Sequence, residues 1–471
     1  MHSMQARDHL SGEPAPGPCG AFARASSAPL DVRDSAAAPH AWDTAPDTAP
    51  RERDTPAPRD VDRDVPGAVE HLLRRLLGER LAEASALDPG FARDLADRTA
   101  RFTLRGGRRL RPQFVWWALR CAGEPDADRV EAALRIGAAL ELIQTCALVH
   151  DDVMDDAPLR RGRPALHAAV TAQYDATASP GRAGPLGVAA AILAGDLALV
   201  WADDVVAANT LPPDTARRVR RLWAAMRTEM VAGQYLDVHG QATASRSASG
   251  ALRAARLKSA LYSVERPLAL GAALAGTGPA ATEALCAAGR HVGLAFQLRD
   301  DLDDVFGDPG RTGKPSGGDL REGKPTLLLA VARARAAETG DRHALGVLDD
   351  LVGRADLADA GLDRVRDVFE ATGAHAAVEE RIGLLLARGL RRLDAARPAP
   401  EAHRRLRALM GAVAAPAASA PGTPHPTGAP PGPPHDDARP RSGATGGPAP
   451  APAPVPPAPC ASGAGPETTS R

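Results

Sequence analysis

The sequence contains little lysine, few aromatic residues and few cysteines. Of its 57 basic residues only three are lysines, Lys258, Lys314 and Lys324, and the rest are arginines. Aromatic residues make up 3% of the chain, too few to line a large pocket with rings. The five cysteines are odd in number and show no C-x-x-C spacing. They therefore argue against a disulfide framework or a zinc site, and favour a reducing compartment.

The sequence also has almost no net charge and no long uninterrupted apolar run. A formal net charge of −1 leaves no electrostatic footprint for nucleic acid. The first residues contain no apolar core of a signal peptide, so we expect no secretory signal. The most apolar stretch, 186–201, is interrupted by Asp196 and is too short to span a bilayer. These features predict a cytoplasmic protein without a transmembrane segment.

Proline is concentrated at the two ends of the chain. Of the 43 prolines, 10 fall within residues 1–66 and 17 within residues 416–471. Both segments have few large apolar side chains, so they cannot bury enough surface to offset the entropy of ordering. We therefore expect disordered tails at 1–66 and 416–471, flanking one domain at 67–415.

The central segment has the pattern of helices. Its first apolar residues recur at the helical spacing of an amphipathic stripe, and Ala-rich stretches of high helix propensity follow at 131–150, 186–207, 213–238 and 281–304. No stretch alternates apolar and polar residues as a half-buried strand does. The sequence predicts an all-α domain without strands. The members of the stripe are Val69, Leu72, Leu73, Leu76, Leu77 and Leu81.

Two clusters of aspartates end apolar helical stretches. Each contains D-D-x-x-D, with Asp151, Asp152 and Asp155 in the first and Asp300, Asp301 and Asp304 in the second. Residues four apart share a helix face, so each cluster can converge on a hard cation such as Mg²⁺. A solvated acidic helix end is the simpler reading of one cluster. Two clusters on helices that should be buried favour facing metal sites, because unpaired buried charges are costly.

Basic segments interleave with the acidic ones. Arg108 and Arg111 lie in the segment GGRRLRP, and Arg160 and Arg161 follow the first aspartate cluster. Lys314 and Lys324 lie in glycine-containing loops after the second cluster. Arginine forks and close backbone approach at glycine both suit diphosphate oxygens. The combination predicts a cavity for diphosphate esters bridged by Mg²⁺.

Several of these motifs together resemble the trans-isoprenyl diphosphate (polyprenyl) synthases, and most of all their geranylgeranyl-producing members. The resemblance covers about 67–410 and includes GGRRLRP, HDDVMDDAPLRRGRP, GQYLD, KSALYSVERPL, FQLRDDLDDVFGD and GKPSGGDLREGKPT, in the order of the family. It implies the all-α isoprenoid synthase fold around a central cavity, usually as a homodimer. It also implies an enzyme that joins an allylic diphosphate (dimethylallyl, geranyl or farnesyl) to isopentenyl diphosphate.

The resemblance assigns the site residues. The metal ligands would be Asp151, Asp152, Asp155, Asp300 and Asp304, with Asp301 in the same motif and about three Mg²⁺ ions per active site. Arg160 or Arg161, with the three lysines, would hold the allylic diphosphate, and Arg108 and Arg111 would hold isopentenyl diphosphate. The last two assigned residues, Ser259 and Gln297, would lie near the allylic carbon.

Three positions depart from the family pattern. Gln144 stands where the family commonly has a histidine that contacts isopentenyl diphosphate, and it can still donate a hydrogen bond. Arg108 replaces the usual lysine and keeps the charge, and Ser259 replaces threonine and keeps the hydroxyl. We expect weaker substrate binding from the first change rather than inactivity.

Product length depends on the residues before the first aspartate cluster. In the family, bulky residues there close the chain pocket early, whereas here the positions hold the small Cys146 and Ala147. We therefore expect a C20 product, geranylgeranyl diphosphate, or a longer one. Aromatic residues on the preceding helix, Phe114, Trp116 and Trp117, could instead close the pocket.

Three alternatives remain open at this stage. A farnesyl diphosphate synthase would stop at C15. A class I terpene cyclase shares an aspartate-rich metal site but needs aromatic ring faces to stabilise its cations. A non-catalytic subunit of a heteromeric synthase would be expected to lose acids from at least one cluster, and both clusters are complete here.

Overall fold

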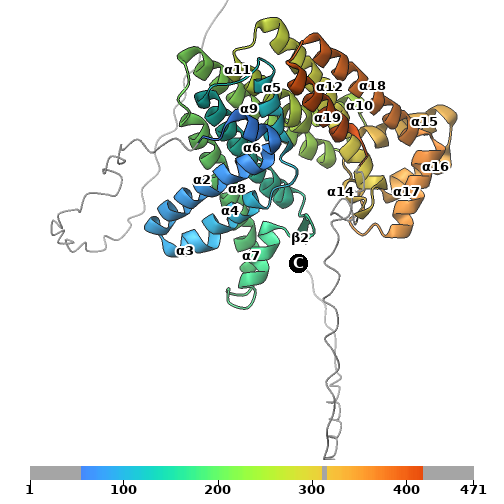
Figure 1. Cartoon of the computed structure of the whole chain (residues 1–471). Coiled ribbons are helices and arrows are strands. Elements are labelled where there is room, and N and C mark those ends of the chain that lie inside the picture. The colour runs from blue at the N-terminus through green and yellow to red at the C-terminus, as the bar shows by residue number, and fades with distance from the viewer. Residues whose placement is uncertain (1–54, 310–315, 417–471) are drawn as a thin grey trace, which may run out of the picture.

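The computed structural model describes residues 55–309 and 316–416, and within these ranges the chain is almost entirely helical (Figure 1). The helices are α1 (Pro58–Arg63), α2 (Val65–Leu87), α3 (Pro89–Phe91), η1 (Ala92–Ala96), α4 (Asp97–Leu104), α5 (Leu110–Arg120), α6 (Ala127–Met154), α7 (Leu166–Tyr174), α8 (Ala183–Ala207), α9 (Pro213–Ala242), α10 (Ala248–Ala255), η2 (Arg256–Glu265), α11 (Arg266–Ala275), α12 (Pro279–Phe306), α14 (Gly318–Glu322), α15 (Leu327–Thr339), α16 (Arg342–Leu351), α17 (Asp359–Ala371), α18 (Ala374–Ala395) and α19 (Pro400–Ala414). The segments η1 and η2 are π-helical. The all-α expectation is confirmed.

Local sequence explains where many of these helices begin and end. The Asp126 carboxylate accepts a hydrogen bond from the Arg129 amide at 2.9 Å and so caps the start of α6. Gly276 ends α11 in the left-handed conformation with φ of 68°, which glycine adopts without steric cost. Each of the four Ala-rich stretches lies mainly within one long helix, namely α6, α8, α9 or α12.

Helix α6 forms the centre of the core. It packs against α8, α5 and α2, and most of its side chains are buried around the whole circumference. The predicted stripe on α2 faces this helix, with Val69, Leu72, Leu73 and Leu77 buried. Helix α12 packs on η2 and α18 in the other half of the molecule. The carboxyl-terminal ends of α6 and α12 carry the two aspartate clusters.

Two expectations about secondary structure need correction. Helix α1 lies within the segment 1–66 that proline content assigned to a tail, and its Val61 side chain is fully buried, so helical structure begins before residue 67. A two-residue strand pair, β1 (Leu159–Arg160) and β2 (Arg163–Pro164), forms where no strand was expected. Arg161 and Gly162, both at positive φ, make its tight turn. Most of both expected tails lies outside the described residues.

Two described helices are long and apolar enough to cross a membrane, by length and composition alone. Helix α6 is 78% buried over its apolar window, which explains its composition as that of a core helix. Helix α8 is only 33% buried over its window, and it is longer than the apolar run 186–201 suggested. Its outer face exposes Leu186, Leu193 and Val200, spaced seven residues apart. This face is a large apolar surface without a partner in the single chain.

Candidate active site

Most of the residues that the sequence selected line one large cavity. Its volume is about 1500 Å³, and side chains from α6, α9, η2 and α12 form its walls. Of the selected residues, the lining includes Arg108, Arg111, Gln144, Cys146, Ala147, Asp151, Arg160, Arg161, Lys258, Ser259, Gln297, Asp300, Asp301 and Lys324. Residues as far apart in sequence as Arg108 and Lys324 therefore line the walls of the same cavity. Lys314 lies outside the described residues.

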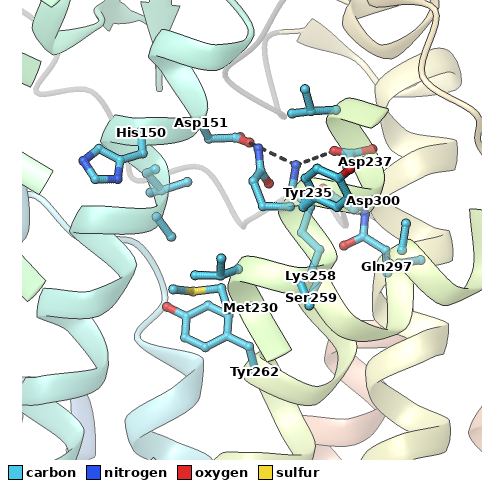
Figure 2. A pocket seen from close by; sticks show the side chains of 18 of the residues that line it. His150, Asp151, Met230, Tyr235, Asp237, Lys258, Ser259, Tyr262, Gln297 and Asp300 are labelled. Atoms are coloured by element: carbon cyan, nitrogen blue, oxygen red, sulfur yellow. Dashed lines mark hydrogen bonds and ion pairs between the residues drawn. The ribbon is translucent and has the colours of Figure 1, made fainter. Parts of the chain in front are cut away.

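Lys258 connects the end of α6 to α9 (Figure 2). Its Nζ lies 2.9 Å from Asp151 Oδ1 and 2.6 Å from Asp237 Oδ2. Gln234 Nε2 also donates to Asp151 Oδ1, at 3.0 Å. Burial opposes ionisation of the Asp151 carboxyl, but the ammonium groups of Lys258 and Lys324 outweigh it and hold the pKa of Asp151 below its ordinary value. Asp151 is therefore anionic at neutral pH.

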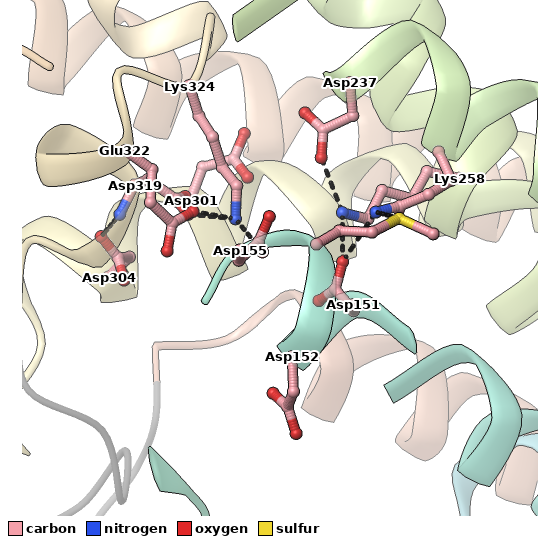
Figure 3. Close-up of polar contacts among 12 residues, drawn as sticks. Asp151, Asp152, Asp155, Asp237, Lys258, Asp301, Asp304, Asp319, Glu322 and Lys324 are labelled. Carbon is pink, nitrogen blue, oxygen red and sulfur yellow. Dashed lines mark hydrogen bonds and ion pairs between the residues drawn. The ribbon is translucent and has the colours of Figure 1, made fainter. Parts of the chain in front are cut away.

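Lys324 makes the corresponding contacts on the other side (Figure 3). Its Nζ lies 3.0 Å from Asp155 Oδ2, 3.4 Å from Asp319 Oδ1 and 2.6 Å from Glu322 Oε2. Burial alone would lower the pKa of Lys324, but the surrounding carboxylates raise it above its ordinary value. The loop before α15 thus places one compact cation among three acids.

Asp152 and Arg160 form a pair beside this centre. The Asp152 side chain is buried and points away from Lys258 and Lys324 (Figure 3). Arg160 Nε donates to Asp152 Oδ1 at 2.7 Å, and Arg160 Nη2 lies 3.5 Å from Asp151 Oδ2. The structure therefore shows Asp152 orienting Arg160 toward the cavity. Its assignment as a metal ligand remains a prediction.

The second aspartate cluster divides along the faces of α12. Asp300 and Asp301 line the cavity, and Gln297 Nε2 donates to Asp301 Oδ1 at 2.8 Å. Asp304 accepts from the Asp319 amide at 3.0 Å and so joins α12 to the start of α14. Burial, and then the neighbouring Asp319, raise the pKa of Asp301 well above its ordinary value. The ionised form of Asp301 is therefore unfavourable unless cations lie beside it.

The segment GGRRLRP forms a basic turn that is anchored to the core through Arg109. Arg109, at φ of 46°, is buried, and its Nη1 donates to Glu141 Oε2 at 3.0 Å. It is therefore an internal anchor, while Arg108 and Arg111 line the cavity. Arg161 Nη1 donates to the Arg105 carbonyl at 3.0 Å, which attaches the β1–β2 turn to the same place. The structure thus groups Arg161 with Arg108 and Arg111, and places Arg160 with the acids.

Several functional candidates escaped selection from the sequence. The structure adds Asp237 and Gln234 on α9, Asp319 and Glu322 around Lys324, and Tyr262 on η2. Asp237 and Gln234 lie in GQYLD, and Asp319 and Glu322 lie in GGDLREGK, so both motifs had drawn notice without single residues being chosen. Tyr262 lies in KSALYSVERPL, but it was not chosen there because its contacts come from residues far away in the chain.

The chemistry of the donor set fits Mg²⁺. Asp155 Oδ1 is buried without a hydrogen-bond partner, which suits a carboxylate oxygen that binds a cation. Within the described ranges no group of three or more His, Cys, Asp or Glu residues is close enough to hold an ion. The ammonium groups of Lys258 and Lys324 lie between the acids instead.

The cavity is not closed by the aromatic residues of α5. Phe114, Trp116 and Trp117 are all buried in the core, and none of them lines it. The lining residues instead follow α9 from Asp237 back through Gln234, Met230 and Arg227 to Ala224. The small side chains of Cys146 and Ala147 leave this course open on the α6 side.

Comparison with known proteins points to one family. A family model described as polyprenyl synthetase matches residues 93–359. A (2E,6E)-farnesyl diphosphate synthase of Mycobacterium tuberculosis is 33% identical over 267 residues, 57% of this chain and 68% of that protein. A geranylfarnesyl diphosphate synthase of Aeropyrum pernix is 30% identical over 302 residues, 60% of this chain and 89% of the relative.

A solved structure shares the fold. The geranylgeranyl pyrophosphate synthase of Corynebacterium glutamicum, complexed with isoprenyl diphosphate and magnesium, superposes with a TM-score of 0.70 at 38% identity. The match covers 75% of this chain and 98% of that one.

Proposed function

Because the chain belongs to the polyprenyl synthetase family and is a trans-prenyltransferase, we propose that it is a Mg²⁺-dependent synthase of geranylgeranyl diphosphate. It would join an allylic diphosphate (dimethylallyl, geranyl or farnesyl) to isopentenyl diphosphate. The observation that supports this most strongly is that Asp151, Asp300 and Asp301, from the two aspartate clusters, line one cavity together with two separate basic groups. An acidic metal site flanked by two phosphate sites matches two diphosphate substrates.

The two basic groups suggest which substrate binds where. Lys258, Lys324 and Arg160 contact the acids and would hold the allylic diphosphate beside the metal ions. Arg108, Arg111 and Arg161, with Gln144, would hold isopentenyl diphosphate on the side of the basic turn. Mg²⁺ held by Asp151, Asp155, Asp300 and Asp304 would neutralise the charge that develops on the leaving diphosphate.

The chemistry then requires few protein groups. The allylic C–O bond breaks with the electron pair leaving on diphosphate, and the double bond of isopentenyl diphosphate attacks the allylic carbon. The Ser259 hydroxyl and the Gln297 side chain line the cavity close to this centre and would stabilise the positive carbon with their oxygen dipoles. Loss of one proton restores the double bond. The departed diphosphate can accept that proton, so we assign no protein base.

The course of the cavity supports a product of C20 or longer. The lining residues on α9 extend from Asp237, beside the proposed diphosphate position, to Ala224, a rise of about 20 Å at about 1.5 Å per residue. The small Cys146 and Ala147 leave room for the chain on the α6 side, and Leu199 and Arg227 lie along its far part.

Incubation with each allylic primer tests the proposed activity. Purified protein with Mg²⁺, isopentenyl diphosphate and dimethylallyl, geranyl or farnesyl diphosphate should give C20 product as the main species, and EDTA should abolish turnover. Product that stops at C15 would instead identify a farnesyl diphosphate synthase. Cyclic hydrocarbon would identify a terpene cyclase, and activity only with an added second chain would identify a subunit of a heteromeric synthase.

Cys146→Phe tests the course of the chain. A phenyl ring in place of the thiol would fill the pocket about 1.4 helical turns before Asp151, so the main product should shorten from C20 to C15 or C10. Cys286→Phe is a control for the addition of the same ring, because Cys286 is buried on α12 and does not line the cavity. Unchanged product length in Cys146→Phe, with the fold intact, contradicts the proposed pocket.

The homodimer and the cytoplasmic location also belong to this proposal. A second copy would cover the apolar face of α8, together with Val231 and Tyr235 of α9, which are exposed and also line the cavity. The odd cysteine count and the free thiols of Cys121, Cys146 and Cys286 support a reducing compartment.

A further inference from the structure

Gln144 and Tyr262 contact each other at the wall of the proposed isopentenyl diphosphate site. The Tyr262 hydroxyl donates to Gln144 Oε1 at 2.7 Å, which joins η2 to α6 across 118 positions of sequence. The guanidinium carbon of Arg111 lies 4.2 Å from the centre of the Tyr262 ring. Arg111 Nη2 also donates to the Ser263 hydroxyl at 2.9 Å. Tyr262 is 3% exposed, so this arrangement is held within the wall.

The orientation of the Gln144 amide decides whether it can bind a diphosphate. An amide presents an acceptor oxygen on one side and two N–H donors on the other. Arg108, Arg111 and Arg161 line the same cavity and carry only donors, so they would attract the amide oxygen into it. In that orientation the oxygen would face the phosphate oxygens and repel them. A glutamine here therefore needs a partner that holds its oxygen away.

Tyr262 has the right polarity for this purpose. The guanidinium of Arg111 lies over the ring and carries only donors, so it cannot accept from the Tyr262 hydroxyl, and the hydroxyl proton is available to Gln144. The Gln144 oxygen accepts a hydrogen bond from this hydroxyl, and the amide nitrogen remains for another partner. Burial raises the pKa of the Tyr262 phenol above its ordinary value, so the proton is present at every physiological pH.

We propose that Tyr262 is a positioning residue for isopentenyl diphosphate, which holds the Gln144 amide with its N–H donors toward the diphosphate. This inference rests on the proposed function. Tyr262 acts through Gln144 and need not contact the substrate itself. The pair would allow a glutamine to replace the common histidine while keeping a fixed donor.

Binding of isopentenyl diphosphate alone tests the inference, since without an allylic partner no reaction follows. Calorimetric titration with isopentenyl diphosphate should give a dissociation constant about fivefold higher for Tyr262→Phe, the usual effect of one lost neutral hydrogen bond. The phenyl ring remains under Arg111, so packing is preserved. In steady-state assays the KM for isopentenyl diphosphate should rise likewise, while the KM for the allylic diphosphate stays within twofold.

Two further variants test the contribution of the Gln144 side-chain amide to the binding of isopentenyl diphosphate. Gln144→Ala should weaken binding to a similar degree, and Tyr262→Phe should add nothing in that background, because the two residues act as one unit. Gln144→Glu keeps the acceptor for Tyr262 but presents an oxygen to the diphosphate, so it should bind more weakly than Gln144→Ala. Tyr174→Phe is the matched control, because its hydroxyl contacts Asp94 and does not line the cavity.

The outcomes separate this inference from the proposed function. An unchanged dissociation constant in Tyr262→Phe overturns the inference, as does an equal loss with and without Gln144. In either case a wild-type protein that makes prenyl diphosphate leaves the proposed function intact. A wild-type protein that neither binds isopentenyl diphosphate nor forms product overturns both.

Discussion

The lysines carry the most specific residue-scale information. All three fall within residues 251–330, and the two that the structure describes lie among carboxylates at the cavity. An ammonium group is compact and can contact several oxygens around a point, whereas a guanidinium is a planar fork. In a sequence that otherwise uses arginine, Lys258 and Lys324 each place one ammonium group within contact of two or three carboxylates.

Substitution by arginine tests this interpretation. Lys258→Arg and Lys324→Arg should each lower kcat about tenfold or more, equivalent to about 1.4 kcal/mol of transition-state stabilisation. Lys314→Arg should also impair turnover. The reverse change Arg246→Lys serves as a control at an exposed ion pair with Asp349 and should leave kcat unchanged. Near-normal rates for all three lysine variants would reduce the pattern to coincidence.

At the scale of elements, the π-helix η2 carries Lys258, Ser259 and Tyr262, and its neighbours approach it very closely. A Cβ atom built on Gly233 of α9 would lie 2.0 Å from the Lys258 backbone nitrogen, and one on Gly293 of α12 would lie 2.3 Å from the Ala260 carbonyl oxygen. Two glycines therefore allow η2 to lie between α9 and α12. This close packing sets the position of the Lys258 backbone along η2, from which its side chain contacts Asp151.

Gly233→Ala should disturb both stability and catalysis. The added methyl group must displace backbone, so we expect a loss of about 3 kcal/mol in the free energy of unfolding and a lower kcat. Gly383→Ala on α18 is the control, since nothing lies within 4 Å of its Cβ position and alanine is the better helix former by about 1 kcal/mol. Urea unfolding and steady-state kinetics on both variants measure the difference. Equal effects would show that η2 tolerates a shift.

An ion pair joins α12 to α18 at Arg299, the residue that directly precedes the second aspartate cluster. Arg299 is buried, and its Nη1 lies 2.6 Å from Glu379 Oε1. The hydrogen bond from Arg299 lowers the pKa of the Glu379 carboxyl, against the smaller opposing effect of burial. A lowered folded-state pKa gives stability that is complete above the unfolded pKa of about 4.3 and is lost as the pH falls through the folded value.

Glu379→Gln should therefore change the pH dependence of unfolding. At pH 7 the variant should lose about 1 kcal/mol, a value reduced for solvent screening because Glu379 is partly exposed. As the pH falls below the unfolded pKa of about 4.3 and through the lowered folded pKa of Glu379, the wild type loses the same contribution, so the two stabilities should converge there. Urea unfolding at pH 7 and at a series of values from about pH 5 down to about pH 2 checks this. A constant difference between the proteins across the whole series would show that the pair does not contribute through ionisation.

At the scale of the whole molecule, the apolar face of α8 is an exposed surface that the packing of the single described chain does not cover. Leu193 and Val200 are each 56% exposed on a helix of high mean hydropathy. A second copy that covers this face would remove the apolar area from water and would also close the cavity where Val231 and Tyr235 are exposed.

Leu193→Glu tests the proposed dimer. A buried, unpaired carboxylate at the interface should shift the protein from dimer to monomer in analytical ultracentrifugation at micromolar concentration. Leu384→Glu on α18 is the matched control, a leucine of similar exposure outside this face. A wild type that sediments as a monomer, or a Leu193→Glu protein that remains dimeric, would contradict the proposed interface.

Residue patterns alone predict the helical class and most of the selected residues that line the cavity. Apolar periodicity and alanine content predict helices because neighbouring turns repeat every 3.6 residues, and D-D-x-x-D predicts convergent carboxylates for the same reason. Composition placed the start of helical structure too late, because α1 is short and is held by tertiary burial of Val61. A sequence motif likewise identifies a candidate residue but does not predict the direction of its side chain.

How these residues form separate groups follows from the packing of the helices against one another. It turned Asp152 toward Arg160, buried Arg109 against Glu141, and grouped Arg161 with the basic turn. It also brought Tyr262 to Gln144 from the other half of the chain. Such contacts depend on which faces of distant helices pack together, and local residue patterns contain no record of that choice. The scarcity of lysine drew attention to Lys258 and Lys324 as candidates for the allylic diphosphate, and only the structure placed their ammonium groups against the acids.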